Sequence, residues 1–330
     1  MQEYTNVTGV PLSVAAFLAN DSYDHDDNTI SATGLMRPIR QSILAPRVPT
    51  AEAKVDLQSV WKSRQGTAIH DAIERVWTTG QYKTAMKAMN YPAAVINRIV
   101  VNPDDDGVRG PDDINVYLEQ RLYREFMGYN ISGKFDFIGD GTLEDFKSTS
   151  VFTWVYGTKN DDYALQGSIY RWLDSAQTKP KITSDYITIQ FFFTDWVGFK
   201  ASSEANYPAN AVMKKDIPLL SLAETEQYIT AKLNALNKYK DADESDLPRC
   251  DDRDLWRKPP VYKYYKNKNS TKRSTKNFDS QTEAYARMQQ DNNVGMVKEV
   301  PGQVVACRFC PAFPICTQKD EYLADGSLII

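Results

Sequence analysis

The chain of 330 residues is 42% apolar and 25% charged, so it can bury a core as one large domain or two ordinary ones. Its 39 Lys and Arg against 43 Asp and Glu give a formal net charge of −4, which excludes a strongly basic nucleic-acid binder and makes any polyanion site local. The apolar runs stay below the ~18 residues that a membrane span needs, so we expect no membrane partner. No Lys or Arg precedes Arg37, so the basic flank of a secretory signal is missing and we expect a cytoplasmic protein.

Composition and periodicity divide the chain into three expected ranges. These are an N-terminal wrap of loops and short helices over residues 1–60, a mixed α/β core over residues 60–240 and a small accessory lobe over residues 241–330. The elements predicted in the core are, in chain order, a helix over 60–76, strands within 114–126 and 131–148, a helix over 161–176, a strand over 186–193 and a helix over 221–239. Capping-box spacing opens that last helix at Ser221 and predicts a further short helix from Ser280 to Met288.

A predicted hairpin around Asp140-Gly141 is the most informative segment, because this dipeptide between two strand-like runs is typical of a type I′ turn. With these two residues as the loop, Asp136 falls directly opposite Asp145, and alternation places Lys147 on the same face. Like charges at this spacing repel each other, so the arrangement asks for a compensating cation. Carboxylate oxygens suit Mg²⁺ or Mn²⁺.

The other face of this hairpin carries Phe135, Phe137 and Phe146, which we expect to pack on the core. The alternative to a metal site is a solvated hairpin in which Lys134 and Lys147 neutralise the carboxylates. A β-bulge would also change the expected register.

An Asp followed, after a hairpin, by Asp-x-Lys resembles the PD-(D/E)xK nuclease pattern, and further features resemble its RecB-like exonuclease branch. Residues 66–74 are similar to the GxxxHxxxE helix of that branch and include His70, one of two histidines in the chain. Gln166 and Tyr170 resemble its QxxxY helix, and the motifs occur in the family's order. The resemblance implies a restriction-endonuclease-like core, a central mixed sheet flanked by helices.

The resemblance also implies roles for individual residues. The catalytic metal would be bound by His70, Asp136, Asp145 and the main-chain carbonyl of Phe146. Lys147 would orient or deprotonate the attacking water.

Gln166 and Tyr170 would support this site and contact the phosphate of the scissile strand, and Glu119 would add a further carboxylate. The implied function is an Mg²⁺- or Mn²⁺-dependent deoxyribonuclease, most readily an exonuclease, in a bacterium or a phage-infected cell. DNA is then the expected partner, alongside an unidentified recombination or replication protein. The alternatives are a non-catalytic DNA-binding module and a structure-selective endonuclease of the same fold.

Four cysteines lie after the nuclease motifs: Cys307, Cys310 and Cys316 in a C-x2-C-x5-C run, with Cys250 before it. Four thiolates suffice for one closed metal site, and the spacing alone allows either zinc or iron–sulfur. The run resembles the C-terminal part of the iron–sulfur staple of RecB-like nucleases, which implies a 4Fe-4S cluster that fastens the accessory lobe, with Zn²⁺ as the alternative. In those families the first cysteine usually precedes the nuclease motifs, whereas here, as in some phage-type relatives, it follows them. Unligated cysteines or disulfides are a further possibility, which an intracellular location disfavours.

The accessory lobe also carries a basic segment. Residues 255–278 contain eight Lys or Arg and no acid, interleaved with aromatic residues. Such a pattern suits a surface that follows a phosphate backbone, and Lys263, Lys266 and Lys268 are the candidate DNA contacts. The alternative is a solvated charged face.

Overall fold

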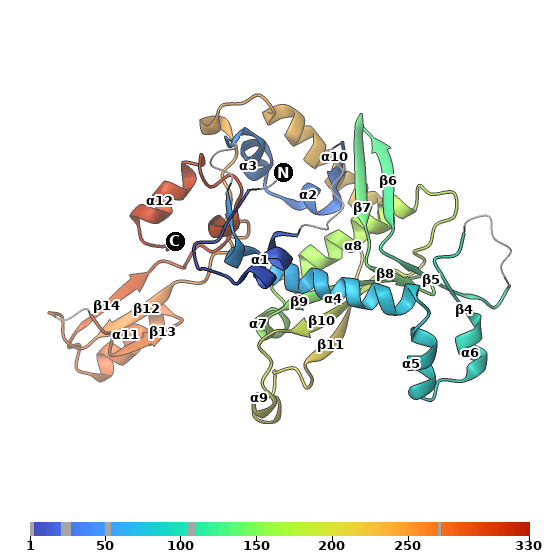
Figure 1. Cartoon of the computed structure of the whole chain (residues 1–330). Helices are drawn as coiled ribbons and strands as arrows, with labels where there is room; N and C mark the ends of the chain where they lie inside the picture. Colours follow the sequence, from blue (N-terminus) through green and yellow to red (C-terminus); the bar gives the residue numbers. More distant parts are fainter. Residues whose placement is uncertain (1–2, 21–27, 50–53, 105–109, 270–271) are drawn as a thin grey trace. The chain divides into compact units, whose positions relative to one another are not determined.

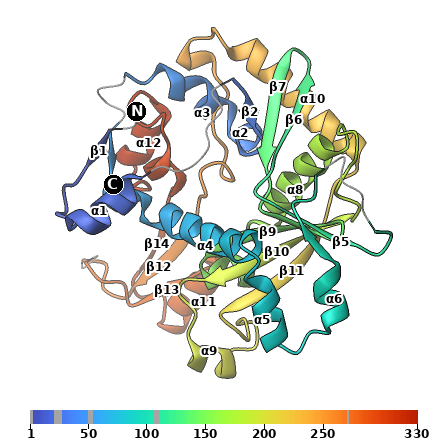
Figure 2. The same ribbon diagram turned by 45° about the vertical axis from the view of Figure 1, so that its right-hand side comes forward.

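The computed structural model describes residues 3–20, 28–49, 54–104, 110–269 and 272–330. The chain forms two compact units: unit 1 comprises residues 1–36 and 55–234, and unit 2 comprises residues 37–54 and 235–330 (Figures 1 and 2). Helices and strands occur in both, so the fold is mixed α/β, with several sheets flanked by helices. Among the described residues, no helix is both long enough and apolar enough to cross a membrane.

Unit 1 is built around a six-stranded mixed sheet with the order β11-β10-β9-β8-β5-β4. β4 and β5 are parallel, as are β9 and β10, and the other neighbours are antiparallel. The strands are β4 (Ile99–Val101), β5 (Ile114–Leu118), β8 (Phe137–Gly139), β9 (Thr142–Thr149), β10 (Tyr186–Phe193) and β11 (Val212–Pro218). A separate three-stranded sheet contains β2 (Ile30–Ser31), β7 (Tyr129–Lys134) and β6 (Arg121–Phe126) in that order, and β1 (Tyr4–Thr5) pairs with β3 (Val55–Asp56).

The β8–β9 hairpin has the expected register from the Gly139–Thr142 pair to the Phe137–Glu144 pair. Asp136 lies outside this ladder because β8 begins at Phe137, so the expected pairing with Asp145 is absent: Asp136 contacts His70 on α4 (Trp61–Thr78), whereas Asp145 contacts Gln166 on α8 (Asn160–Asp174). Asp140 and Gly141 have φ values of 48° and 81°, the left-handed conformation that both positions of a type I′ turn require. A Cβ atom on Gly141 would lie 2.1 Å from Thr183 Oγ1, so glycine is required there for space as well as for backbone conformation.

Helices of unit 1 cover the two faces of the large sheet. The first face is packed against α4 (Trp61–Thr78), whose Ile73 and Trp77 contact a buried cluster that includes Phe137 and Phe146, as the alternation predicted. The opposite face carries Phe191, whose ring lies edge-on to that of Tyr163 on α8 (Asn160–Asp174). The remaining helices of unit 1 are α1 (Leu12–Ala19), α2 (Ala32–Met36), α5 (Tyr82–Ala88), α6 (Ala93–Arg98), α7 (Val151–Tyr156) and α9 (Gly198–Ser203), and α10 (Leu222–Tyr239) extends into unit 2.

Unit 2 joins a short N-terminal segment to the C-terminal part of the chain. Leu44, at the end of α3 (Ile39–Leu44), packs in a buried cluster with Leu247 and Ala312. Residues 37–54 therefore group with the C-terminal unit, which differs from the expected single N-terminal wrap over residues 1–60. The other elements are β12 (Val261–Tyr265), β13 (Lys276–Phe278) and β14 (Met296–Val300), which form an antiparallel sheet with β12 in the centre, together with α11 (Gln281–Gln290) and α12 (Gln318–Ala324).

Candidate active site

A histidine and two carboxylates meet at one end of the β8–β9 hairpin. His70 lies on α4, Glu119 in the turn between β5 and β6, and Asp136 directly before β8. Nδ1 of His70 is 3.7 Å from Glu119 Oε1 and 3.5 Å from Asp136 Oδ1. Within the described ranges, this is the one group of three such side chains whose ligand atoms all lie within 4.8 Å of one another. Nitrogen and oxygen donors at this spacing can share one metal ion.

Backbone contacts fix the orientation of the group. Asp136 Oδ2 accepts a hydrogen bond from the Phe146 main-chain N–H at 2.7 Å, and His70 Nε2 lies 3.1 Å from the Phe146 carbonyl oxygen. Glu119 has a φ of 52°, a left-handed conformation that ends β5, and its Oε2 pairs with Lys134 Nζ at 2.6 Å. The hairpin and the β5–β6 turn thus present their carboxylates to the same helix.

Asp145 and Lys147 point toward α8. Lys147 Nζ is 2.5 Å from Asp145 Oδ2 and donates to Gln166 Oε1 at 3.2 Å. The amide nitrogen of Gln166 donates to Asp145 Oδ1 at 3.2 Å and to the Tyr170 hydroxyl at 3.0 Å. The spacing of four residues therefore places Gln166 and Tyr170 on one face of the helix, with the amide between the acid and the lysine.

Burial makes the electrostatics of the site strong. Burial, and then the charge of Asp145, raise the pKa of Asp136 to about 7. Burial acts to lower the pKa of His70, but the hydrogen bond to Glu119 and the charge of Asp136 outweigh it and raise that pKa to about 9. Burial likewise opposes the charged form of Lys147, yet the charges of Asp145 and Asp136 raise its pKa above the ordinary value. Lys147 is therefore a cation in this arrangement.

The group of close ligand atoms includes Glu119, which was expected as an additional carboxylate, but not Asp145, which was expected as a ligand. Asp145 lies outside it because its carboxylate is turned to Lys147 and Gln166, whereas Glu119 lies inside it. Sequence reasoning missed Tyr163, whose ring centroid is 5.6 Å from Lys147 Nζ. Its position three residues before Gln166 on an amphipathic helix was the available signal.

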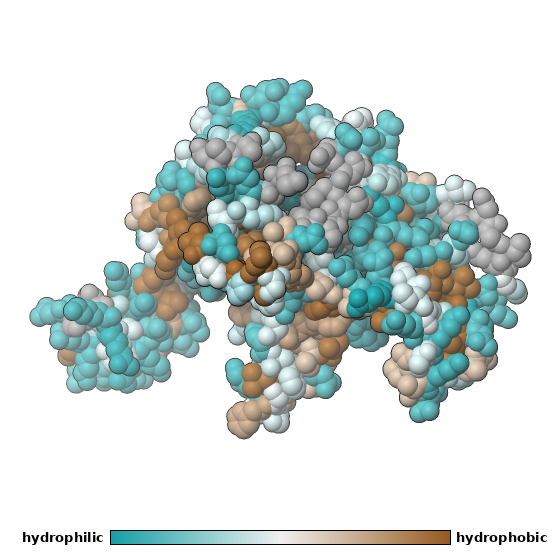
Figure 3. All heavy atoms as spheres, viewed as in Figure 1, coloured by the Kyte–Doolittle hydropathy of each residue, from teal (hydrophilic) through white to brown (hydrophobic). Residues whose placement is uncertain are grey.

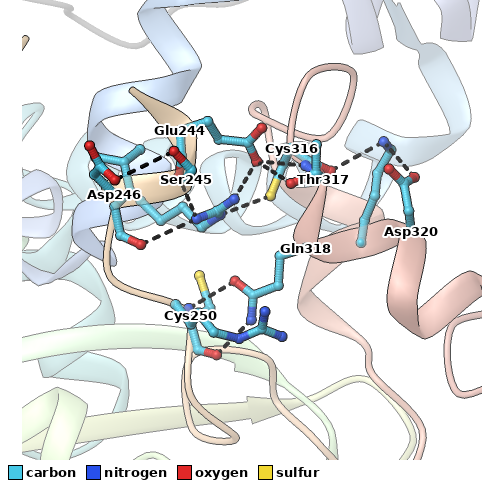
Figure 4. A network of polar contacts seen from close by, with 12 residues as sticks. Glu244, Ser245, Asp246, Cys250, Cys316, Thr317, Gln318 and Asp320 are labelled. Atoms are coloured by element: carbon cyan, nitrogen blue, oxygen red, sulfur yellow. Dashed lines mark hydrogen bonds and ion pairs between the residues drawn. The ribbon is translucent and has the colours of Figure 1, made fainter. Parts of the chain in front are cut away.

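The four cysteines come together in unit 2. All four are free thiols, and they line one cavity with residues that include Arg40, Phe313 and Gln318. Gln318 accepts from the Cys250 N–H at 2.9 Å and donates to the Cys250 carbonyl at 2.8 Å, which holds Cys250 beside the C-terminal run (Figure 4).

The donor set of this cavity fits a metal centre. Burial, followed by neighbouring negative charges that include the other thiolates, raises the pKa of Cys250 to about 12 and that of Cys307 to about 11. Four thiolates at such a place repel one another unless a cation lies between them.

The three lysines of the basic segment lie in and directly after β12. Lys263 is half-buried within the strand, opposite Asn277 on one side and Lys298 on the other. Lys266 and Lys268 are exposed beyond it, with Lys266 Nζ 3.9 Å from Asp291 Oδ1. Figure 3 shows hydrophilic side chains gathered over this part of unit 2.

Comparison with known proteins adds little to this description. A scan against models of protein families finds no match, and neither does a search of curated proteins. Among solved structures, the crystal structure of SSO0001 is similar over 70% of this chain and 88% of its own, with 17% identity and a TM-score of 0.38. A likeness at that level carries no argument about function.

Proposed function

We propose that this protein is a metal-dependent DNA nuclease whose active site is built on the β8–β9 hairpin. The observation that carries the proposal is the carboxyl of Asp136, buried beside His70 and Glu119 with its pKa raised to about 7 by burial and by the charge of Asp145. Lys134 and Lys147 pair with Glu119 and Asp145, which leaves His70 as the charged partner of Asp136. A divalent cation would relieve the remaining repulsion between these buried acids. A surface salt-bridge hairpin would not show this burial.

His70, Glu119 and Asp136 would hold Mg²⁺ or Mn²⁺. The Phe146 carbonyl, 3.1 Å from His70 Nε2, and Asp145, whose charge acts on Asp136, are the further candidate ligands. Oxygen-rich ligands with one imidazole suit these hard cations. The bound ion would supply Lewis acidity at the phosphate and a water of lowered pKa.

The protein's own groups would position the reacting water and steady the phosphate. Lys147 is held by Asp145 and Gln166, and its raised pKa keeps it charged. It therefore suits orienting a water and stabilising negative charge on the phosphate more than removing a proton. Gln166 hydrogen-bonds both members of the Asp145–Lys147 ion pair and so fixes their orientation, and Tyr170 holds the Gln166 amide from the next turn of α8.

DNA as the substrate is supported by the resemblance to RecB-like exonucleases and by the lysines at and after β12. Degradation from a strand end is the form of the activity that this resemblance favours. A DNA-binding module that has lost turnover is the second candidate, and an endonuclease of the same fold is the third. The ion pair of Lys147 with Asp145 favours the enzymes, since binding alone needs no lysine beside a buried acid.

We further propose that the four cysteines hold a 4Fe-4S cluster. The C-x2-C-x5-C run resembles the C-terminal part of the iron–sulfur staple of RecB-like nucleases, and this resemblance supports the cluster over a single zinc ion, which is the alternative.

Nuclease assays on linear and circular DNA, single- and double-stranded, with Mg²⁺ or Mn²⁺ test the function. We expect Lys147→Met and Asp136→Asn each to lower the cleavage rate by about 10²-fold or more, since each removes a charge that acts on the reacting phosphate or its metal. Lys200→Met on α9, where Lys200 pairs with Glu204, is the matched control and should cleave normally.

Sparing of circular substrates would identify an exonuclease. If the folded, metal-supplied native protein cleaves none of these substrates, the enzyme proposal fails and the binding module replaces it.

A further inference from the structure

A buried arginine from the N-terminal segment lies against one of the four cysteines. Arg40, on α3, is 5% exposed, and its Nε–H donates to Cys316 Sγ at 3.2 Å. One terminal nitrogen donates to the main-chain carbonyls of Glu244 at 3.2 Å and Leu247 at 3.4 Å. The other pairs with the Glu244 carboxylate. Two of the three guanidinium nitrogens thus donate to oxygen atoms, and the third donates to sulfur.

Burial of a guanidinium is unfavourable unless its donors find acceptors. A neutral thiol is a weak acceptor, whereas a metal-bound thiolate would accept the Nε–H as a charged partner. Glu244 links the same arginine to the C-terminal cysteine run by a second route. Its carboxylate also accepts hydrogen bonds from the Thr317 N–H at 2.6 Å and from the Thr317 hydroxyl at 2.9 Å. Thr317 directly follows Cys316, so Arg40 restrains the Cys316 side chain and Glu244 restrains the adjoining main chain.

We propose that Arg40 is a positioning residue of the cysteine metal centre, where it donates a hydrogen bond to the Cys316 thiolate and disperses its negative charge. This inference rests on the proposed metal occupancy of the four cysteines and does not depend on the nuclease activity. Partners that hydrogen-bond a ligand from outside fix its orientation, and their loss typically weakens metal binding ~10–100-fold. Hydrogen bonds and charge near the sulfurs also set the reduction potential of an iron–sulfur cluster.

Arg47 provides a matched control. It lies seven residues further along the same segment and also binds main-chain carbonyls of unit 2, those of Ala242 at 2.8 Å and Lys240 at 2.9 Å. Its contacts dock the segment but involve no sulfur. Arg47→Gln therefore removes docking alone, and Arg40→Gln removes docking together with the hydrogen bond to Cys316.

The experiment uses the full chain purified without oxygen as the native protein, Arg40→Gln, Arg40→Lys and Arg47→Gln. Iron, sulfide and zinc per chain are measured first, followed by the rate of metal loss to a chelator and the midpoint potential of any iron–sulfur cluster. We expect Arg40→Gln to lose metal ~10–100-fold faster than the native protein and to show a lower potential. Arg40→Lys keeps the charge but lacks the Nε–H, so it should fall between the two, and Arg47→Gln should match the native protein.

Equal rates of metal loss for the Arg40 and Arg47 variants would overturn the inference, because they would show that docking explains the whole effect. If Arg40→Lys loses metal at the native rate, the proposed role of the Nε–H is wrong. This comparison also tests the inference if Arg40→Gln does not fold. If the native protein carries neither iron nor zinc, the inference fails together with the proposed cysteine centre. If the protein cleaves no DNA but the variants show this pattern of metal loss, the inference still holds.

Discussion

At the scale of single residues, the carboxyl of Asp136 carries the strongest electrostatic conflict in the candidate active site. Its pKa is raised to about 7, first by burial and then by the charge of Asp145, from an ordinary value near 3.8. Between these values the folded protein binds a proton that the unfolded chain has released. The contribution of Asp136 to the free energy of unfolding of the metal-free protein therefore falls as the pH rises from about 4 to about 7.

Asp136→Asn should remove this pH dependence, because an amide has no charge to bury and its oxygen can still accept from the Phe146 N–H. We expect the metal-free variant to be more stable than the native protein by a few kcal/mol above pH 7, in line with ~1.4 kcal/mol for each pKa unit of the shift, and about equally stable near pH 4. Urea unfolding at several pH values measures the difference.

The control for this prediction is Asp140→Asn in the turn of the same hairpin, where the side chain is exposed and Asn tolerates the left-handed backbone. Addition of Mn²⁺ should then stabilise the native protein and have less effect on Asp136→Asn, since a ligand stabilises the state that binds it. A native protein that gains stability steadily from pH 4 to pH 7 without metal would contradict the assignment.

The sequence predicted which hairpin carries the acids, because Asp140-Gly141 encodes the turn and strand alternation encodes the faces. It did not predict that Glu119, and not Asp145, would lie nearest to His70 and Asp136. That outcome depends on the left-handed backbone of Glu119 at the end of β5 and on the pull of Lys147 and Gln166 on Asp145. Long-range side-chain contacts of this kind leave no local pattern.

At the scale of elements, two glycines show how differently α4 and α8 are packed. Gly66 lies in α4, and a Cβ atom there would find its nearest neighbour, Ser148 Cβ, at 4.0 Å. Gly167 lies in α8, and a Cβ atom there would be 2.8 Å from Leu219 Cδ2 and 2.9 Å from Ile187 Cδ1. Both glycines cost helix propensity, but only the second permits a close approach to the sheet.

The same substitution should therefore have opposite effects in the two helices. Gly66→Ala should stabilise the protein by about 0.5–1 kcal/mol, because alanine loses less backbone entropy in a helix. Gly167→Ala should destabilise it by about 1–3 kcal/mol, because the extra methyl group overpacks the interface between α8 and β10. Denaturant midpoints of the two variants give the comparison, and stabilisation by both would show that α8 has more room than the structure indicates.

The elements with clear periodicity were predictable from the sequence. The helices over 60–76, 161–176 and 221–239 correspond to α4, α8 and α10, and in α10 the predicted capping box forms, with Glu224 N donating to Ser221 Oγ at 3.2 Å and Ser221 N to Glu224 Oε2 at 2.9 Å. The strands over 114–126 and 131–148 were confirmed as strand regions, but the structure divides them between two sheets. The assignment of these strands to two sheets depends on which strands pair with each other, and the alternation of apolar and polar residues does not encode that pairing.

At the scale of the whole molecule, the chain passes from unit 1 to unit 2 and back within its first sixty residues. Leu35 and Leu44 lie nine positions apart and are 0% and 2% exposed, yet Leu35 belongs to unit 1 and Leu44 packs with Leu247 in unit 2. Nothing in the composition of residues 1–60 marks this change of partner. The assignment depends on contacts with residues roughly two hundred positions away.

Two substitutions should each lower the stability of one unit and not of the other. Leu35→Ala and Leu44→Ala each remove buried methyl groups, and each should cost about 2–5 kcal/mol in its own unit. We expect Leu44→Ala to reduce amide hydrogen-exchange protection in residues 37–49 and 235–330, and Leu35→Ala to reduce it in the β8–β9 hairpin and the rest of unit 1. Each variant serves as the control for the other, and identical protection maps would show that the chain unfolds as a single cooperative body.

Unit 2 combines an early segment of the chain with a late one, and this affects the order in which the two units can fold during synthesis. At translation rates of ~5–20 residues per second, Leu44 is made roughly 10–40 seconds before Leu247 and roughly 13–54 seconds before Ala312. During this interval α3 lacks the core that buries it, while the strands of unit 1 are being added one after another. Unit 1 can therefore fold first, whereas Leu44 has no packing partners in unit 2 until Leu247 and Ala312 have been made. The interval is one in which a chaperone could bind this segment of the nascent chain.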